Sequence, residues 1–487
     1  MINMVERFPT LGRFLNFYNL AMLIILAFFI CLVFYGFPDS SSPWFDEGIN
    51  LGITKSWVEH GVFSLQTGPN EFVQERPLLI TTNYPLLAFV ALSFKIFGVG
   101  LWQAKIVMIL FLFAFITLFY LLAQKYYGKN CALVSLALLV TFLPLYGNGK
   151  SVLGEIPGLT YFLAALLMLD NKKRWQIFVT GLLFGLAAAT KPIFLLFVIS
   201  VAISEFLLAM KNKKCDFKYW ILLFCGMAIP LLVWLYTIFP NAASFHHLSD
   251  VVSFYGNPYN TTNTNVILPN LLKFFTESTP IHFTLLLSTF VFSKIVVKPR
   301  TITRVESVLL MFVFLNFLFF LKTVGWYRYF FPAHILLFIL FPCAFCGLAR
   351  KFVGGHKLKM VVTASTFIFF VAVQIINLGF NIKNGFYYNP TPRIFAEAVG
   401  RYVKEGNNVL VINVPEMGFL IKNNFVSQYL QNSPHSIVGS DLMKSSIFPD
   451  FIVSSPWSEN FYLRNYPENE KKYHVVLRGE KYDLYSL

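Results

Sequence analysis

The sequence predicts a polytopic α-helical membrane protein that carries a small extracytoplasmic α/β domain at its C-terminus. Of its 487 residues, 56% are hydrophobic and only 13% are charged, whereas charged residues make up about a quarter of a soluble globular protein. Long apolar runs recur along most of the chain, as expected of helices that cross a bilayer. The region after about residue 385 is polar and contains no such run.

Eleven apolar runs are expected to span the membrane. The first is followed by Trp44-Phe45-Asp46-Glu47 and not by small residues that could form a cleavage site, so we interpret it as a retained span and not as a signal peptide. The runs lie at about residues 17–37, 101–122, 131–147, 156–169, 176–190, 192–210, 219–239, 281–297, 305–322, 331–348 and 358–380.

The run from Tyr84 to Phe97 is treated differently. It is about 14 residues long, begins at Pro85 and contains Lys95, which favours an interfacial or re-entrant helix over a span. If it does not cross, five basic clusters fall on the same side as Arg7 and Arg13, as the positive-inside rule requires. These clusters are Lys125/Lys129, Lys172–Arg174, Lys211–Lys218, Lys294–Arg304 and Arg350–Lys359.

This topology places the N-terminus in the cytoplasm and the C-terminus outside a cell membrane, such as a bacterial inner membrane. We expect a membrane domain over residues 1–384, with extracytoplasmic loops at 38–100 and 240–280, and a soluble α/β domain over 385–487. Turns at 148–155 and 323–330, and the Lys191-Pro192 junction, also fall outside. Pro192 is suited to start a helix after a tight turn.

The predicted C-terminal domain alternates helical and strand patterns. Ile394–Lys404 has helical periodicity, Asn408–Val414 is typical of a buried strand, and Phe451–Val453 and Tyr473–Leu477 are typical of further strands. The domain has no glycine-rich fingerprint, so the sequence does not indicate a nucleotide site.

Charge and cysteine content exclude other classes. The net charge of +15 is explained by loop residues that set membrane orientation, and no nucleic-acid partner is expected. The polar C-terminal region contains none of the six cysteines, so there is no disulfide framework. Cys343 and Cys346 form a CxxC pattern within an apolar run. Helix packing explains that pair better than metal binding, because partner ligands are missing.

Ionisable residues gather at span ends on the predicted outer face. Asp46-Glu47 follows the first span, Glu155 begins the fourth, and Lys191 and Arg328 lie in outer turns. Each has an ordinary explanation, since Lys and Arg can snorkel and Glu155 can lie at a helix N-terminus. Together, carboxylates and cations on one face can position an anionic ligand beside a general base.

The arrangement resembles the GT-C superfamily of membrane glycosyltransferases, in particular the protein-mannosyltransferase and aminoarabinose-transferase-like branch. The acidic pair Asp46-Glu47 after the first span is the hallmark, and the resemblance covers about residues 14–350. Four other segments match the family: Asn83-Tyr84-Pro85-Leu86-Leu87, Gly154-Glu155-Ile156-Pro157, Lys191-Pro192 and Arg328-Tyr329-Phe330-Phe331-Pro332. Two of them depart from the family pattern: Tyr84 replaces a first Pro, and Glu155 stands where the family often has Asp.

The resemblance implies an inverting transfer of a sugar from a polyprenyl-phosphate carrier to a hydroxyl of a lipid, polysaccharide or protein acceptor at the outer face. It places Asp46 as the base, with Glu47 beside it, and Lys191, Arg328 and Tyr329 at the donor phosphate. Glu155 would orient the acceptor or, with Glu47, share a divalent cation such as Mg²⁺, Mn²⁺ or Zn²⁺. The metal requirement stays open, since some relatives bind metal and others do not.

Two other functions stay open at this stage. A transporter or flippase for a lipid-linked sugar would also carry charges in an apolar bundle, although the sequence has no internal repeat of the kind that marks many transporters. An oligosaccharide ligase or polymerase of the same superfamily is the other, although the Trp-Trp-Asp-Tyr-Gly motif of oligosaccharyltransferases is missing. His246-His247 and the loop Asn257–Asn265 are possible acceptor contacts that ordinary loop variation explains better.

Overall fold

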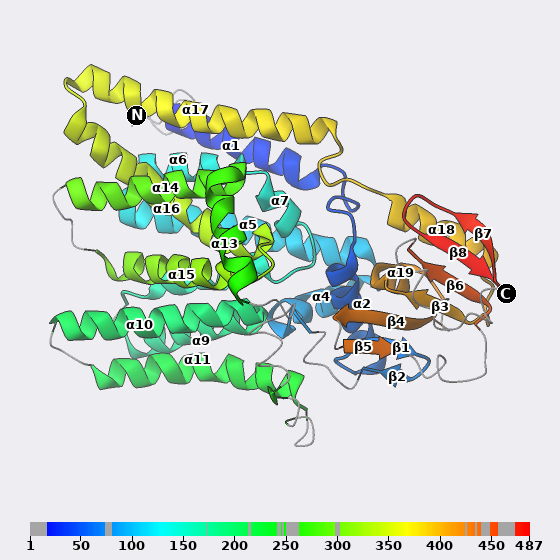
Figure 1. Cartoon of the computed structure of the whole chain (residues 1–487). Coiled ribbons are helices and arrows are strands. Elements are labelled where there is room, and N and C mark those ends of the chain that lie inside the picture. Colours follow the sequence, from blue (N-terminus) through cyan, green and yellow to red (C-terminus); the bar gives the residue numbers. More distant parts are fainter. Residues whose placement is uncertain are drawn as a thin grey trace, which may run out of the picture.

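A helical bundle and a mixed β-sheet make up the protein, and the sheet lies beyond one end of the bundle (Figure 1). The structure is a computed structural model. It describes residues 17–73, 80–171, 173–212, 216–240, 245, 248–249, 263–297, 302–423, 426–433, 436–439, 449–455 and 473–487.

All eleven predicted spans are helical. Seven of the described helices are long and apolar enough to cross a membrane: α5 (Leu101–Tyr127), α10 (Leu195–Asn212, preceded by η2, Pro192–Phe194), α11 (Phe217–Ile238), α14 (Ser278–Val296), α15 (Arg304–Leu321), α16 (Tyr327–Phe352) and α17 (His356–Lys383). The other four are shorter: α1 (Phe17–Phe34), α6 (Lys129–Val140), α8 (Glu155–Met168) and α9 (Arg174–Thr190). The count of eleven spans therefore stays a prediction.

Three predicted boundaries differ from the structure. The run 131–147 is divided into α6 and α7 (Pro144–Gly149), because Pro144 cannot continue a helix and is suited to begin one. The outer loop 38–100 contains two helices, α2 (Phe45–His60) and α4 (Tyr84–Phe97), and the loop 240–280 contains α13 (Asn263–Thr276). Helix α16 begins at Tyr327, so the predicted turn at 323–330 is shorter than expected.

Helix α4 has the bounds and the short length that the sequence predicted for it. Its 14 residues extend about 21 Å at 1.5 Å per residue, less than the bilayer core of about 30 Å. Pro85 lies in its first turn, and the side chain of Asn83 accepts a hydrogen bond from the Tyr84 N–H at 2.6 Å. In Figure 1, α2 and α4 lie between the bundle and the sheet.

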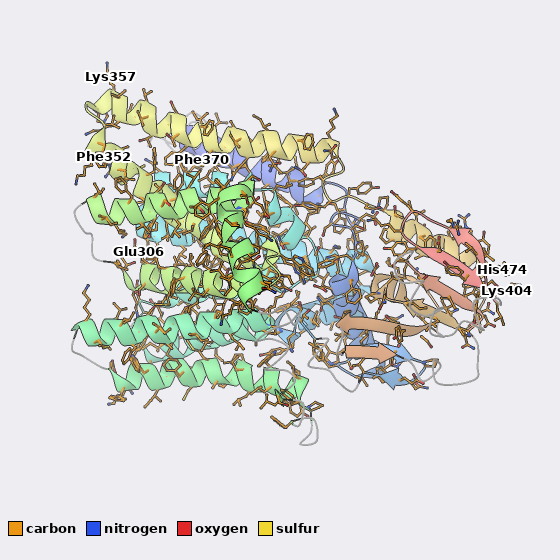
Figure 2. The ribbon with its side chains drawn as sticks, viewed as in Figure 1. Glu306, Phe352, Lys357, Phe370, Lys404 and His474 are labelled. Carbon is orange, nitrogen blue, oxygen red and sulfur yellow. The ribbon has the colours of Figure 1, made fainter. Side chains whose placement is uncertain are left out.

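The two ends of the molecule differ in the residues they carry. Figure 2 shows Glu306, Phe352 and Lys357 at the end of the bundle away from the sheet, and Lys404 and His474 at the opposite end of the molecule. Lys357 belongs to one of the predicted cytoplasmic clusters, and the predicted orientation of the bundle in the membrane stays a prediction.

The C-terminal sheet has six strands in the order β5-β4-β3-β6-β8-β7. Central strand β3 (Val409–Ile412) is buried along its whole length and runs parallel to β4 (Val426–Ser433) and β6 (Phe451–Ser454). A continuous apolar run is typical of such a strand. Strands β5 (Ser436–Gly439), β8 (Asp483–Ser486) and β7 (His474–Arg478) pair antiparallel. The sequence predicted β3, β6, β7 and helix α18 (Thr391–Tyr402), but it did not indicate β4, β5, β8 or α19 (Pro415–Leu420).

The C-terminal domain is attached to one end of the bundle (Figure 1). Arg393 of α18 forms an ion pair with Asp39 at 2.8 Å, and Ser40 forms a β-bridge with Tyr388. Helix α19 packs so closely on α2 that a Cβ on Gly48 would lie 2.2 Å from the Glu416 nitrogen. The hairpin of β1 (Gln66–Gly68) and β2 (Glu71–Phe72) also contacts this domain, because the Gln66 carbonyl accepts a hydrogen bond from the Gln428 amide of β4. The first turn of α2 is therefore packed directly against α19.

Candidate active site

Asp46 and Arg328, which are 282 positions apart, form an ion pair at the end of the bundle that faces the sheet. Arg328 Nη1 lies 2.5 Å from Asp46 Oδ2, and the two side chains are 18% and 17% exposed. Asp46 occupies the first turn of α2, where the helix dipole favours negative charge. The guanidinium also lies 5.0 Å from the Trp44 ring centroid and 5.2 Å from that of Trp326, which favours a cation there.

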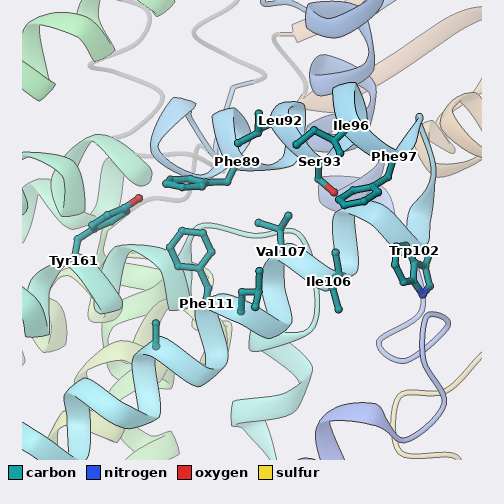
Figure 3. Close-up of a pocket in the computed structure, with 12 residues that line it drawn as sticks. Phe89, Leu92, Ser93, Ile96, Phe97, Trp102, Ile106, Val107, Phe111 and Tyr161 are labelled. Atoms are coloured by element: carbon teal, nitrogen blue, oxygen red, sulfur yellow. The ribbon is translucent and has the colours of Figure 1, made fainter.

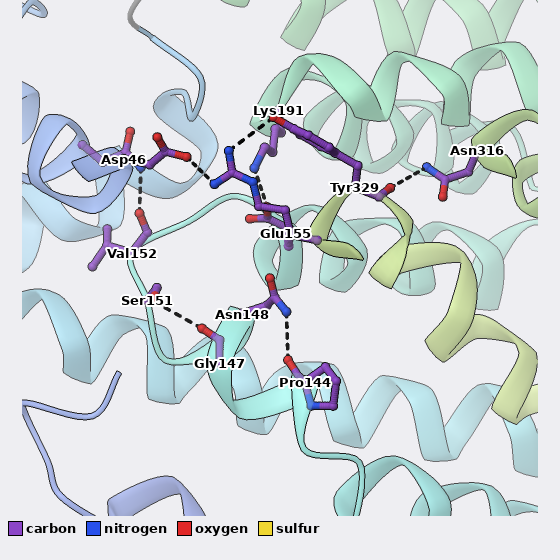
Figure 4. Close-up of polar contacts among 12 residues, drawn as sticks. Asp46, Pro144, Gly147, Asn148, Ser151, Val152, Glu155, Lys191, Asn316 and Tyr329 are labelled. Carbon is purple, nitrogen blue, oxygen red and sulfur yellow. Dashed lines mark hydrogen bonds and ion pairs between the residues drawn. The ribbon is translucent and has the colours of Figure 1, made fainter. Parts of the chain in front are cut away.

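A second ion pair joins Lys191 to Glu155. Glu155 is the first residue of α8 and Lys191 follows the last residue of α9, and their side chains are 2% and 9% exposed. The other carboxylate oxygen of Glu155, Oε2, is buried and has no hydrogen-bond partner within the described part of the chain. Figure 4 shows Asp46, Glu155, Lys191 and Tyr329 pointing toward one another from separate segments.

Tyr329 completes this group of side chains. Its hydroxyl accepts a hydrogen bond from Arg328 Nη2 at 3.3 Å, and its carbonyl accepts one from Asn316 Nδ2 at 3.1 Å (Figure 4). Asn316 is fully buried on α15. This amide therefore fixes the start of α16, and with it the position of the Arg328 guanidinium. Five of the six predicted site residues meet here: Asp46, Glu155, Lys191, Arg328 and Tyr329.

Glu47 points elsewhere, into a buried ion pair with Lys105. Lys105 Nζ lies 2.7 Å from Glu47 Oε1, and neither residue is more than 1% exposed. Lys105 also donates to the Ser41 carbonyl at 2.9 Å, and the Val152 N–H donates to Glu47 at 2.8 Å. Burial raises the pKa of the Glu47 carboxyl, and Lys105 opposes this shift. The pair joins α2 and α5 to the segment that leads into Glu155.

Two side chains that hold the site were not found from the sequence. Lys105 lies in an otherwise uncharged stretch of the run 101–122, and an ionisable residue inside a membrane helix is by itself a sign of function. Lys105 could therefore have been recognised from the sequence by its charge. Asn316 could not, because a single Asn in an apolar run does not indicate which residue it contacts. His246, His247 and residues 257–262, the possible acceptor contacts, lie outside the described residues.

The carboxylates do not fit a shared divalent cation. Glu47 and Glu155 each hold a different lysine ammonium, and a cation would have to displace both. Over the residues the structure describes, no group of three His, Cys, Asp or Glu side chains could hold a metal ion.

An apolar cavity of about 600 Å³ lies between α4 and α5 (Figure 3). Phe89, Leu92 and Ile96 of α4 face Trp102 and Phe111 of α5 across it. Almost all of its lining is carbon, so it suits a hydrocarbon ligand.

The cavity is connected to the ion pairs through the start of α4. The Asn83 N–H donates to the Thr190 carbonyl at 3.0 Å, one residue before Lys191. Tyr161, which also lines the cavity, donates to the Pro85 carbonyl at 2.9 Å and lies on α8, the helix that begins with Glu155. The helices that line the cavity are therefore hydrogen-bonded to the segments that carry Lys191 and Glu155.

Fold comparison defines a multi-pass membrane protein that shares its fold with solved structures of ArnT and of an archaeal oligosaccharyltransferase. Residues 85–236 match the family described as dolichyl-phosphate-mannose-protein mannosyltransferase. The predicted resemblance is therefore confirmed over these residues, which include Glu155 and Lys191 but not Asp46-Glu47 or Arg328. No curated protein matches the chain by sequence.

Three solved structures are similar over 90% or more of the chain. ArnT from Cupriavidus metallidurans, bound to undecaprenyl phosphate, is 12% identical with a TM-score of 0.61, covering 96% of this chain and 97% of ArnT. The oligosaccharyltransferase from Archaeoglobus fulgidus, in complex with zinc and sulfate, is 12% identical with a TM-score of 0.54, covering 93% of this chain and 71% of the relative. The archaeal AglB from the same organism, bound to an inhibitory peptide and a dolichol-phosphate, is 11% identical with a TM-score of 0.53, covering 90% and 69%.

Proposed function

We propose that this protein is an inverting glycosyltransferase that moves a sugar from a polyprenyl-phosphate carrier to a hydroxyl acceptor at the outer face of a membrane. The observation that carries the proposal is the meeting of two carboxylate–cation pairs, Asp46–Arg328 and Glu155–Lys191, beside an apolar cavity. The family match and the lipid phosphates named for the similar structures support the choice of donor.

The donor is held by its chain and its phosphate. The polyprenyl chain occupies the apolar cavity between α4 and α5, and the phosphate lies at Lys191 and Arg328. The planar guanidinium of Arg328 offers several N–H donors to phosphate oxygens, and its Nε has no partner among the described residues. Both cations stabilise the charge that develops on the leaving phosphate.

Asp46 acts as the general base. As the acceptor oxygen attacks the anomeric carbon, the bond from that carbon to the phosphate oxygen breaks. The hydroxyl proton passes to Asp46, and polyprenyl phosphate leaves with the electron pair. Attack in line with the leaving group inverts the anomeric carbon. When the donor phosphate draws Arg328 away from Asp46, it frees the carboxylate oxygen that now accepts from Nη1, so donor binding prepares the base.

The remaining residues position these groups. Glu47, which was expected beside the reacting centre, holds Lys105, Ser41 and Val152 together and thereby fixes the first turn of α2. Glu155 fixes Lys191, and its free buried oxygen is an acceptor for one hydroxyl of a bound sugar. Residues 1–384 form the catalytic domain, and residues 385–487 cover its outer face.

In this proposal the N-terminus is cytoplasmic and the sheet is extracytoplasmic. A cysteine in place of the exposed Lys129, in a cysteine-free background, should be shielded from an impermeant thiol reagent in sealed cells. A cysteine in place of Gly400, which has open space around it, should be labelled. Labelling of the cysteine at position 129 without labelling of the one at position 400 would reverse the assigned orientation.

The proposal is tested by mass spectrometry of surface glycans, lipids and proteins from a strain that lacks the gene. One sugar modification should disappear, return with the wild-type gene, and stay absent with an Asp46→Asn gene expressed at the same level. If every surface molecule retains its mass in the deletion strain, or if Asp46→Asn restores the modification, the proposal fails.

A further inference from the structure

A second, polar cavity of about 300 Å³ lies at the seam between α2 and the C-terminal domain. One wall is the second half of α2, with Lys55, Ser56, Glu59 and His60, and another is the β1–β2 hairpin. The third wall comes from α19 and β4, including Gln428. Neither the ion pairs nor the apolar cavity described above involve these residues.

The walls of this cavity are fixed by contacts between segments far apart in the chain. The Gln428 amide donates to the Gln66 carbonyl at 2.9 Å, across 362 positions. A Cβ on Gly418 would lie 2.6 Å from that same amide, so a side chain at this position would displace Gln428 from its present place. Gln428 is 6% exposed, and its Oε1 has no partner in the part of the chain that the structure describes.

The lining offers both donors and acceptors with no net charge. The Lys55 ammonium and the Ser56 hydroxyl can donate, and the Glu59 carboxylate and the Gln428 carbonyl oxygen can accept. Within the described residues, neither Lys55 nor Glu59 has an ion-pair partner. Vicinal hydroxyls each donate and accept, so they match such a lining, whereas a polyanion would meet Glu59 without a surplus of cations.

Size and place also fit a sugar. A volume of about 300 Å³ is at the lower end of the range for small-molecule sites. Lys55 lies nine residues beyond Asp46 on the same helix, which is about 14 Å along its axis at 1.5 Å per residue. A short oligosaccharide spans such a length.

We propose that this cavity is a subsite for a neutral sugar unit of the acceptor, which is therefore an oligosaccharide or a molecule that carries one. This inference rests on the proposed function, because it takes Asp46 as the place where the acceptor reacts. The subsite holds the acceptor through a unit that does not itself react, and it ties α2 to β4 when occupied.

The test is direct binding of fluorescently labelled oligosaccharides to the full-length protein in detergent micelles. The panel holds neutral tetrasaccharides of glucose, galactose and N-acetylglucosamine, a sulfated tetrasaccharide and an uncharged peptide. At least one neutral tetrasaccharide should bind, and Lys55→Gln with Glu59→Gln should weaken it at least tenfold. Both positions are at least partly exposed, so the fold should persist. Lys422→Gln, an exposed change outside the cavity, is the matched control and should bind normally.

Asp46→Asn separates this inference from the proposed function, because it should bind the tetrasaccharide as the wild type does. If the wild-type protein binds a neutral tetrasaccharide but transfers no sugar, the subsite is supported and the proposed function fails. The subsite is overturned if no neutral tetrasaccharide binds, if the sulfated one or the peptide binds better, or if the double variant binds as tightly as the wild type.

Discussion

Replacing Glu47 by Gln tests whether this carboxylate positions the site or takes part in the chemistry. The change keeps the shape of the side chain and leaves the Lys105 ammonium, which is 1% exposed, without its counter-charge. Removing one partner of a buried ion pair costs about 3–5 kcal/mol. At 1.36 kcal/mol for each tenfold change, this lowers the ratio of folded to unfolded protein roughly 10²- to 10⁴-fold.

The assay is thermal unfolding of the purified protein in detergent, followed by tryptophan fluorescence. Glu47→Gln should lower the midpoint strongly, and Glu47→Gln with Lys105→Met should recover part of the loss, because no uncompensated charge then stays buried. Asp46→Asn is the control and should cost less, since Arg328 keeps access to water and its aromatic contacts. A Glu47→Gln protein with the wild-type midpoint and no transfer activity would show that Glu47 acts in the reaction.

Three further changes test the donor site, the seam and the outer domain. Arg328→Lys should still impair donor binding at least tenfold, because Lys offers a point charge and not a planar fork. Wild-type donor affinity in both this variant and Lys191→Met would contradict the assignment of the phosphate site. Gly48→Ala should lower the thermal midpoint and the transfer rate by pushing α2 away from α19, and Gly400→Ala, which has open space around it, should change neither. Burial raises the pKa of the Glu416 carboxyl from 4.5 to about 7. The stabilisation from the protonated carboxyl is therefore complete below pH 4.5 and is lost as the pH rises through 7. The free energy of unfolding falls by roughly 3 kcal/mol over this range. The wild-type midpoint should therefore fall between pH 5 and 8, and Glu416→Gln should flatten that fall; an identical fall in the variant would exclude Glu416 as its source.

The apolar runs predicted eleven helical segments of the bundle, because a bilayer requires about 20 apolar residues for each crossing and leaves few alternatives. They did not predict α13, which lies in the predicted loop 240–280. They did not predict α2, whose sequence mixes polar and apolar residues and is helical because α19 and α4 pack against it. Central strand β3 was predicted because it is apolar throughout. Strand β4, with the mixed sequence Val426–Ser433, was not, since its register depends on its neighbours.

The candidate site was likewise predicted from the sequence only in part. Positions at span ends predicted that Asp46, Glu155, Lys191 and Arg328 lie on one face, and the resemblance to GT-C enzymes gave them roles. The pairing of Asp46 with Arg328, and of Glu155 with Lys191, depends on how four helices pack. The sequence contains no pattern that distinguishes Glu47 from Asp46. Only the packing of α5 against α2 shows that Glu47 faces Lys105.

The central claim is that Asp46 takes the proton from the acceptor hydroxyl. Its most direct test compares wild-type and Asp46→Asn protein, purified in detergent, for sugar transfer from a polyprenyl-phosphate sugar to the acceptor that the deletion strain reveals. Asn keeps the size of the side chain but cannot accept that proton. We predict a loss of about 10²- to 10⁴-fold in rate, with donor binding retained. Transfer by Asp46→Asn at the wild-type rate would contradict the account.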